Sequence, residues 1–204
     1  MREVANALYS STAVLFNAKY INGFNAPIYI DIRRTLSAVD ERSIIIQALI
    51  DTIAKCYIDC ECVAGVSTAG IPYAAMLAHN LHLPMCYVRQ VPKDHGLGNI
   101  IEGKTLKDQK VVVIEDVLGS GNNALNVVST LQKAEVHVWG IVSIFSYELE
   151  MCIQRISNSK LEYQSLTYYE EVVDLGVKKG IISKADYSKL LYYKENMPDL
   201  AWKS

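Results

Sequence analysis

A run of β-branched residues, followed by two acids and a loop of small residues, constrains this chain more than any other feature. Residues 111–114 are Val-Val-Val-Ile, which is typical of a central parallel strand buried on both faces. Glu115 and Asp116 follow, and residues 119–123 then lead into a helix. That helix has one apolar stripe at helical spacing, made by Ala124, Val127, Val128 and Leu131.

Each part of this segment has a chemical use. Ligands of α/β proteins bind at the carboxyl ends of parallel strands, and small residues let backbone N–H groups approach a ligand closely. The new helix directs its N–H groups and positive dipole end to the same place, which favours a phosphate. Glu115 and Asp116 would repel a phosphate, but they accept hydrogen bonds from ribose hydroxyls. The segment therefore predicts a ribose 5-phosphate site; the alternative is an acidic, Gly-rich turn without a ligand.

Length and charge limit the class of protein. The chain has 204 residues, half of them hydrophobic, which suits one α/β domain with a sizeable core. A net charge of −2 gives no indication of a nucleic-acid or membrane-surface protein. No apolar run reaches the length of a membrane span, and Met1-Arg2-Glu3 does not resemble the start of a signal peptide. A cytoplasmic protein is expected.

The five cysteines do not predict a disulfide framework, because their number is odd and no secretory signal is seen. Cys56, Cys60 and Cys62 invite a metal-site interpretation, but no paired CxxC and no nearby His supports one. All five are expected to be buried, reduced thiols, the others being Cys86 and Cys152.

Hydrophobic periodicity predicts alternating strands and helices, and hence a mostly parallel sheet flanked by helices. Expected strands cover residues 28–32, 62–66, 85–89, 111–114, 136–145 and 163–166. Expected helices cover residues 2–18, 41–57, about 70–81, the stretch after 123, 148–157, 168–175 and 183–193. Asp40 would cap the second of these helices. In the third, the residues expected to face inward are Ile71, Ala74, Ala75 and Ala78. Residues 21–27 and 90–109 are expected loops. Residues 1–204 would form one domain, in which residues 1–40 are a small appended segment, the hood, on a core of residues 41–204.

Several segments together resemble one family. Residues 111–125 resemble the PRPP-binding motif of the type I phosphoribosyltransferases. Tyr87-Val88-Arg89, Lys93-Asp94-His95-Gly96 and the glycines that follow resemble the flexible catalytic loop of orotate phosphoribosyltransferases. Residues 27–33 resemble the orotate-side segment of that family, and residues 140–149 resemble its Gram-positive-type members. The resemblance implies the type I phosphoribosyltransferase fold.

The resemblance also implies a reaction. The family transfers the phosphoribosyl group of PRPP to orotate, giving orotidine 5'-monophosphate and pyrophosphate in de novo pyrimidine biosynthesis. Mg²⁺ would be the cofactor, held mostly by substrate oxygens and water and by no direct protein ligand. A homodimer is implied, in which the catalytic loop serves the neighbouring subunit's site. Nucleic acid and membranes are not expected partners.

Residue roles follow from the resemblance. Arg89, Lys93 and His95 would contact pyrophosphate, and Glu115 and Asp116 would hold the ribose hydroxyls. Tyr29 would lie on the orotate side. Backbone N–H groups of the pyrophosphate loop would come from Ser67, Thr68, Ala69 and Gly70, and the 5-phosphate loop would comprise Gly119, Ser120, Gly121, Asn122 and Asn123. The alternatives are a strand-end salt bridge for Arg89, core filling for Tyr29, and solvated surface groups for Lys93 and His95.

The chain departs from the family pattern near the base and the phosphate. Asn22, Ala26 and Gly119 stand where hydroxylated residues are usual, and Gln90 replaces a second polar or cationic residue. Asn122-Asn123 stand in the phosphate loop. Two other functions therefore stay open: a phosphoribosyltransferase for another nucleobase, and a non-catalytic module that senses PRPP or a nucleotide.

Overall fold

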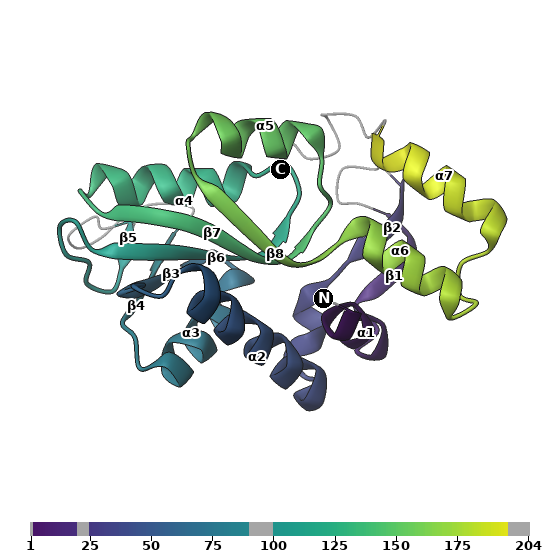
Figure 1. The fold of residues 1–204 in the computed structure, drawn as a ribbon, viewed down its shortest axis with the longest axis horizontal. Coiled ribbons are helices and arrows are strands. Elements are labelled where there is room, and N and C mark those ends of the chain that lie inside the picture. Colours follow the sequence, from purple (N-terminus) through teal and green to yellow (C-terminus); the bar gives the residue numbers. More distant parts are fainter. Residues whose placement is uncertain (1, 20–24, 90–99, 196–204) are drawn as a thin grey trace.

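The computed structural model describes residues 2–19, 25–89 and 100–195, and it shows a six-stranded sheet with helices on both faces (Figure 1). The strands are β1 (Val14–Lys19), β2 (Asn25–Ile30), β3 (Cys62–Val66), β4 (Met85–Val88), β5 (Ile101–Glu102), β6 (Lys110–Leu118), β7 (His137–Ser146) and β8 (Glu162–Tyr168). The helices are α1 (Arg2–Ser10), the 3-10 helix η1 (Ile32–Leu36), α2 (Val39–Cys56), α3 (Gly70–Leu81), α4 (Asn122–Lys133), α5 (Glu150–Asn158), α6 (Tyr169–Lys178) and α7 (Lys184–Glu195). The predicted α/β class and mostly parallel sheet are confirmed.

The sheet has the order β5-β4-β3-β6-β7-β8, so β6 lies at its centre. All neighbours are parallel except β5, which is antiparallel to β4. Residues 111–114 are fully buried, which confirms the predicted central strand. However, β6 continues to Leu118, paired with Ser146 of β7, so Glu115 and Asp116 lie within the strand and not after its end. The strand is longer than its apolar run because β7 continues beside it.

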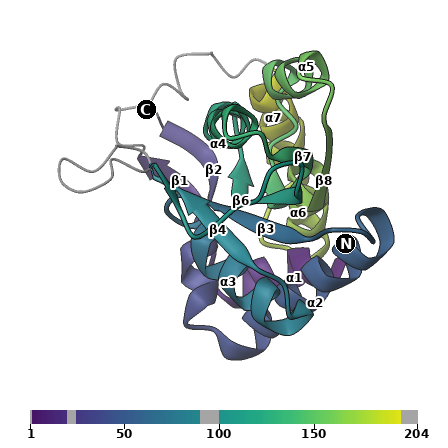
Figure 2. The ribbon, with the colours of Figure 1, turned by 90° about the vertical axis from the view of Figure 1, so that its left-hand side faces the viewer.

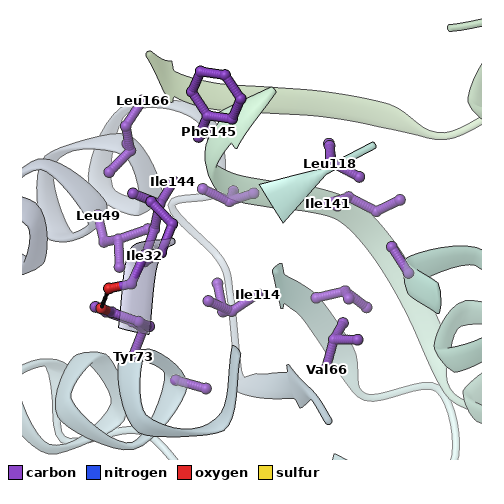
Figure 3. Close-up of a cluster of buried hydrophobic side chains, with 14 of the residues drawn as sticks. Ile32, Leu49, Val66, Tyr73, Ile114, Leu118, Ile141, Ile144, Phe145 and Leu166 are labelled. Carbon is purple, nitrogen blue, oxygen red and sulfur yellow. Dashed lines mark hydrogen bonds between the residues drawn. The ribbon is translucent and has the colours of Figure 1, made fainter. Parts of the chain in front are cut away.

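Two layers of helices bury the sheet. Helices α2 and α3 cover one face, and α4 and α5 cover the other (Figures 1 and 2). Side chains from both layers and from the sheet form one core, and each large aliphatic side chain buried there contributes roughly 1.5–3 kcal/mol (Figure 3). Among those drawn in Figure 3 are Ile32, Leu49, Val66, Tyr73, Ile114, Leu118, Ile141, Ile144, Phe145 and Leu166.

The prediction of one helix over residues 2–18 was wrong. Helix α1 ends at Ser10, where the Ser11 hydroxyl donates to the Ala7 carbonyl and Thr12 takes a positive φ of 57°. The chain then reverses into β1, which pairs antiparallel with β2, Val14 opposite Ile30. Residues 14–19 form a strand because they pair with β2. A helical pattern within one segment cannot predict pairing with another segment.

Other boundaries also differ from the expectations. Asp40 lies in the first turn of α2, and Ala38 is the residue before it without a side-chain cap. Helix α3 turns Tyr73 and Leu77 inward together with Ala74 and Ala78, whereas Ile71 and Ala75 are only partly buried. The expected loop over residues 90–109 contains β5, which depends on pairing with β4. Cys56 is exposed, so the expectation of burial was wrong for it; the other four cysteines are buried and all five are unpaired.

Helix α1 packs against α2 and α6, and η1 packs against α2. The first 40 residues thus bring β2 and η1 to the side of the main sheet (Figure 1). Over the described ranges, none of the helices combines the length and apolar character needed to cross a membrane.

Candidate active site

The two acids of β6 lie between two loops that follow parallel strands. Gly65 of β3 pairs with Ile114 of β6, so the loop of residues 67–70 leaves the sheet beside Glu115. The loop of residues 119–121 begins four residues further along β6, roughly 13 Å away for an extended strand. Each loop leads into a helix N-terminus, that of α3 and that of α4. The edge therefore presents N–H groups, then carboxyls, then N–H groups again.

The first loop packs directly against β6. A Cβ at Gly70 would lie 2.5 Å from the Ile114 carbonyl oxygen, so only glycine allows this approach. The Ser67 hydroxyl donates to the Val88 carbonyl of β4, and the Ser67–Thr68 peptide bond is cis. Thr68 is exposed, while Ser67 and Ala69 are partly buried. The start of α3 is thus held beside the acids with its loop open to solvent.

The acids differ in environment. Glu115 is 5% exposed, whereas Asp116 is only partly buried. The Asp116 backbone N–H donates to Glu115 Oε1 at 3.2 Å. Burial, and next the charge of Asp116, raise the pKa of Glu115 well above its ordinary value. The two carboxyl groups provide acceptors for sugar hydroxyls, and a raised pKa favours the protonated form of Glu115, which can also donate.

The second loop ends at Gly121, which precedes α4 with a positive φ of 80°. A Cβ there would lie 3.0 Å from the Cys152 Sγ of α5, so this glycine serves both the turn and the packing. The Asn122 N–H lies 3.4 Å from the Ser120 hydroxyl. Within the described residues, the N–H groups of Asn123 and Ala124 have no acceptor. An anion at this helix N-terminus would meet them.

Tyr29 reaches this edge from the hood. It is partly buried, and burial is the main cause that raises the pKa of its hydroxyl. The charge of Arg33 lowers this pKa, and the charges of Asp31 and Asp116 raise it. The charge of Asp116 is the smallest of these contributions to the raised pKa of Tyr29. Arg33 also lies in the field of Asp116, although its main partner is Asp31, at 2.6 Å from Nε to Oδ1. The orotate-side role of Tyr29 and the core-filling alternative both stay predictions.

Two buried tyrosines fix the hood segment in place. The Tyr147 hydroxyl accepts from the Ile30 N–H at 3.2 Å and donates to the Ile28 carbonyl at 3.4 Å. The Tyr73 hydroxyl donates to the Ile32 carbonyl at 2.9 Å and also contacts the Thr35 hydroxyl at 2.5 Å. Figure 3 shows Tyr73 beside Ile32. Sequence reasoning missed both tyrosines, since a tyrosine after a strand or inside a helix looks like ordinary core.

The expected pyrophosphate contacts are only partly visible. Arg89 Nη1 lies 3.3 Å from Glu102 Oε1, so the salt-bridge alternative is present in the structure, and contact with pyrophosphate stays a prediction. Lys93 and His95 lie outside the described residues, as do Gln90 and Asn22, and so does the side chain of Ala26. In the described part of the chain, no three His, Cys, Asp or Glu residues are grouped to hold a metal ion.

Known proteins share both the sequence and the fold. The model of the phosphoribosyl transferase domain matches residues 35–178. The orotate phosphoribosyltransferase of Bacillus anthracis is 40% identical over 205 residues, covering 98% of each protein, and that of Cytophaga hutchinsonii is 38% identical over 206 residues, covering 99% of this chain and 98% of the relative.

A solved structure agrees with these relatives. The orotate phosphoribosyltransferase from Aeropyrum pernix superimposes with a TM-score of 0.75 at 27% identity, covering 87% of this chain and 98% of that one. The chain therefore belongs to the phosphoribosyltransferase family, among the orotate phosphoribosyltransferases.

Proposed function

We propose that this chain transfers the phosphoribosyl group of PRPP to orotate, forming orotidine 5'-monophosphate and pyrophosphate, at the carboxyl edge of β3 and β6. The observation that carries this proposal is the order of groups along that edge, in which an acid pair separates two loops that each open a helix. PRPP has the same order, with a ribose between pyrophosphate and a 5-phosphate. The activity is that of the relatives named above, which match this chain over almost its whole length.

The geometry supports a division of labour. Residues 67–70 bind pyrophosphate through the N-terminal end of α3, and residues 119–123 bind the 5-phosphate through the N-terminal end of α4. Glu115 and Asp116 hold the ribose hydroxyls between them. The orotate ring nitrogen attacks C1 of the ribose as the C1–oxygen bond to pyrophosphate breaks. The Asp116 charge stabilises the positive charge that develops on the ribose.

The oxygens at this edge suit Mg²⁺, which the family resemblance implies, because carboxylate, substrate and water oxygens are its preferred ligands. Substrate oxygens and water would provide most ligands of the ion, and the partly exposed carboxylate of Asp116 would reach it through water and not directly. When bound, the ion offsets the negative charge of pyrophosphate. Arg89 would turn from Glu102 to a pyrophosphate oxygen, and Lys93 and His95 would add charge and a proton donor from their loop.

Tyr29 would contact the orotate ring. Its strand, β2, is held by the hydrogen bonds of the Tyr147 hydroxyl to Ile28 and Ile30. A homodimer in which the 93–96 loop serves the neighbouring subunit follows from the family resemblance. A cytoplasmic location completes the proposal.

The experiment is turnover of the purified chain with PRPP, Mg²⁺ and a panel of bases. Loss of orotate absorbance, much faster than turnover of any other pyrimidine or purine, is the expected result. A faster reaction with another base would support the alternative that Gly119 and Ala26 admit a different base. Binding of PRPP without turnover of any base, at high protein concentration, would support a sensing module.

A further inference from the structure

An arginine outside the acid pair and both loops lies against the proposed 5-phosphate loop. Arg155 is on α5, and its Nη1 donates to the Ser120 carbonyl at 3.1 Å. Cys152, one turn earlier on the same helix, packs under Gly121. Burial raises the pKa of the Cys152 thiol to about 11, while the Arg155 charge lowers it and Glu115 raises it. Arg155 and Glu115 thus both act on one thiol beneath the loop.

Among residues 2–19, 25–89 and 100–195, no carboxylate forms an ion pair with Arg155. In this part of the chain, the other hydrogen bond of Arg155 is from the same Nη1 to Met151 Sδ, at 3.9 Å. Arg155 as a whole is partly buried. The N–H groups of Arg155 Nε and Nη2 have no acceptor among the described residues. Burying part of a cation without an anionic partner costs free energy, and a bound anion would offset that cost.

The loop itself offers few side-chain donors. The Ser120 hydroxyl oxygen accepts a hydrogen bond from the Asn122 N–H. Asn122 and Asn123 are both exposed. Neutral amides bind a phosphate less strongly than a charged, two-pronged guanidinium does. A positive charge next to the Ser120 backbone would supply what the loop lacks.

We propose that Arg155 is a further phosphate-binding determinant, which fixes the loop through the Ser120 carbonyl and provides the positive charge for the 5-phosphate of the ligand. This inference rests on the proposed function for the place of the 5-phosphate. It requires α5 to act as part of the binding site and not only as a cover for the sheet.

The test is calorimetric binding of ribose 5-phosphate and, separately, of pyrophosphate to the full chain. In Arg155→Gln, the affinity for ribose 5-phosphate should fall about tenfold or more, and that for pyrophosphate should stay within about twofold. Arg155→Lys keeps the charge and should lose less. Lys133→Gln removes one exposed positive charge at the other end of α4 and should change neither affinity.

Unchanged affinity of Arg155→Gln for ribose 5-phosphate would overturn the inference, and so would equal losses for both ligands. If Arg155→Gln does not fold, Arg155→Met decides, because it keeps an apolar stem of similar length and removes the charge. A loss confined to ribose 5-phosphate supports the inference, and no loss contradicts it. A parent chain that binds ribose 5-phosphate through Arg155 but does not turn over orotate would contradict the proposed function and leave this inference standing.

Discussion

The hydroxyl of Tyr147 lies 3.2 Å from the backbone nitrogen of Ile30, and so it ties the end of β7 to the strand that carries Tyr29. Both Tyr147 and Ile30 are buried. The position of β2, which carries Tyr29, therefore depends on a side chain outside the proposed site.

Tyr147→Phe should separate base binding from PRPP binding. It leaves the buried Ile30 N–H and Ile28 carbonyl without the hydroxyl, which costs about 1–3 kcal/mol of unfolding free energy. We expect the KM for orotate to rise several-fold more than the KM for PRPP. Tyr57→Phe is a matched control, because the Tyr57 hydroxyl is buried without a partner in the described structure, and it should be as stable as the parent or more so. Equal changes in both KM values would contradict the positioning role.

Glu115 should make stability depend on pH. Its pKa is raised in the folded state by burial, so between its ordinary value of 4.5 and the raised value the folded chain binds a proton that the unfolded chain has lost. The stabilisation is complete below pH 4.5 and is lost as pH rises to the folded pKa. Glu115→Gln imitates the protonated form, so denaturant titrations should show the parent losing unfolding free energy relative to the variant as pH rises above 4.5. Parallel pH profiles would refute this account of the carboxyl.

Gly70→Ala should damage the pyrophosphate loop. A methyl group there would meet the Ile114 carbonyl at 2.5 Å, which forces β6 and α3 apart next to Glu115. We expect a loss of about 2 kcal/mol or more of unfolding free energy and weaker pyrophosphate binding. In Gly180→Ala the new methyl group meets nothing within 4 Å and the cost comes from a φ of +70°, so stability should fall by about 1 kcal/mol without loss of pyrophosphate affinity. Normal pyrophosphate binding by Gly70→Ala would show that the loop does not depend on this approach.

Lys93→Ala tests the predicted catalytic loop. Removing a charge that acts on pyrophosphate should lower kcat by about 100-fold or more, with little change in melting temperature. Lys107→Ala is the control, because Lys107 is an exposed partner of Glu135 away from the acid pair, and its activity should equal that of the parent. Parent-like turnover by Lys93→Ala would exclude the assigned role.

The parts of the fold that local sequence determines were predicted well. The buried strand of residues 62–66 and the four-residue stripe of α4, from Ala124 to Leu131, are where the pattern placed them. The β1–β2 hairpin and β5 were missed because each depends on a partner strand that the local pattern does not contain. The order of loops and acids around Glu115 was predicted from the pattern of strands and helices. The burial of Glu115 depends on neighbouring elements that this pattern does not contain. Tyr147 and Arg155 could not be found from sequence, since only the packing of β2 and of α5 gives them a partner at the site.

The central claim is that Glu115 and Asp116 grip a ribose while the amides that follow β6 grip its phosphate. A crystal structure of the chain with orotidine 5'-monophosphate tests it most directly. The account predicts the ribose hydroxyls within hydrogen-bond distance of both carboxyls, and the phosphate on the N–H groups of residues 120–124. A nucleotide bound elsewhere, or one whose phosphate lies at residues 67–70, would contradict it.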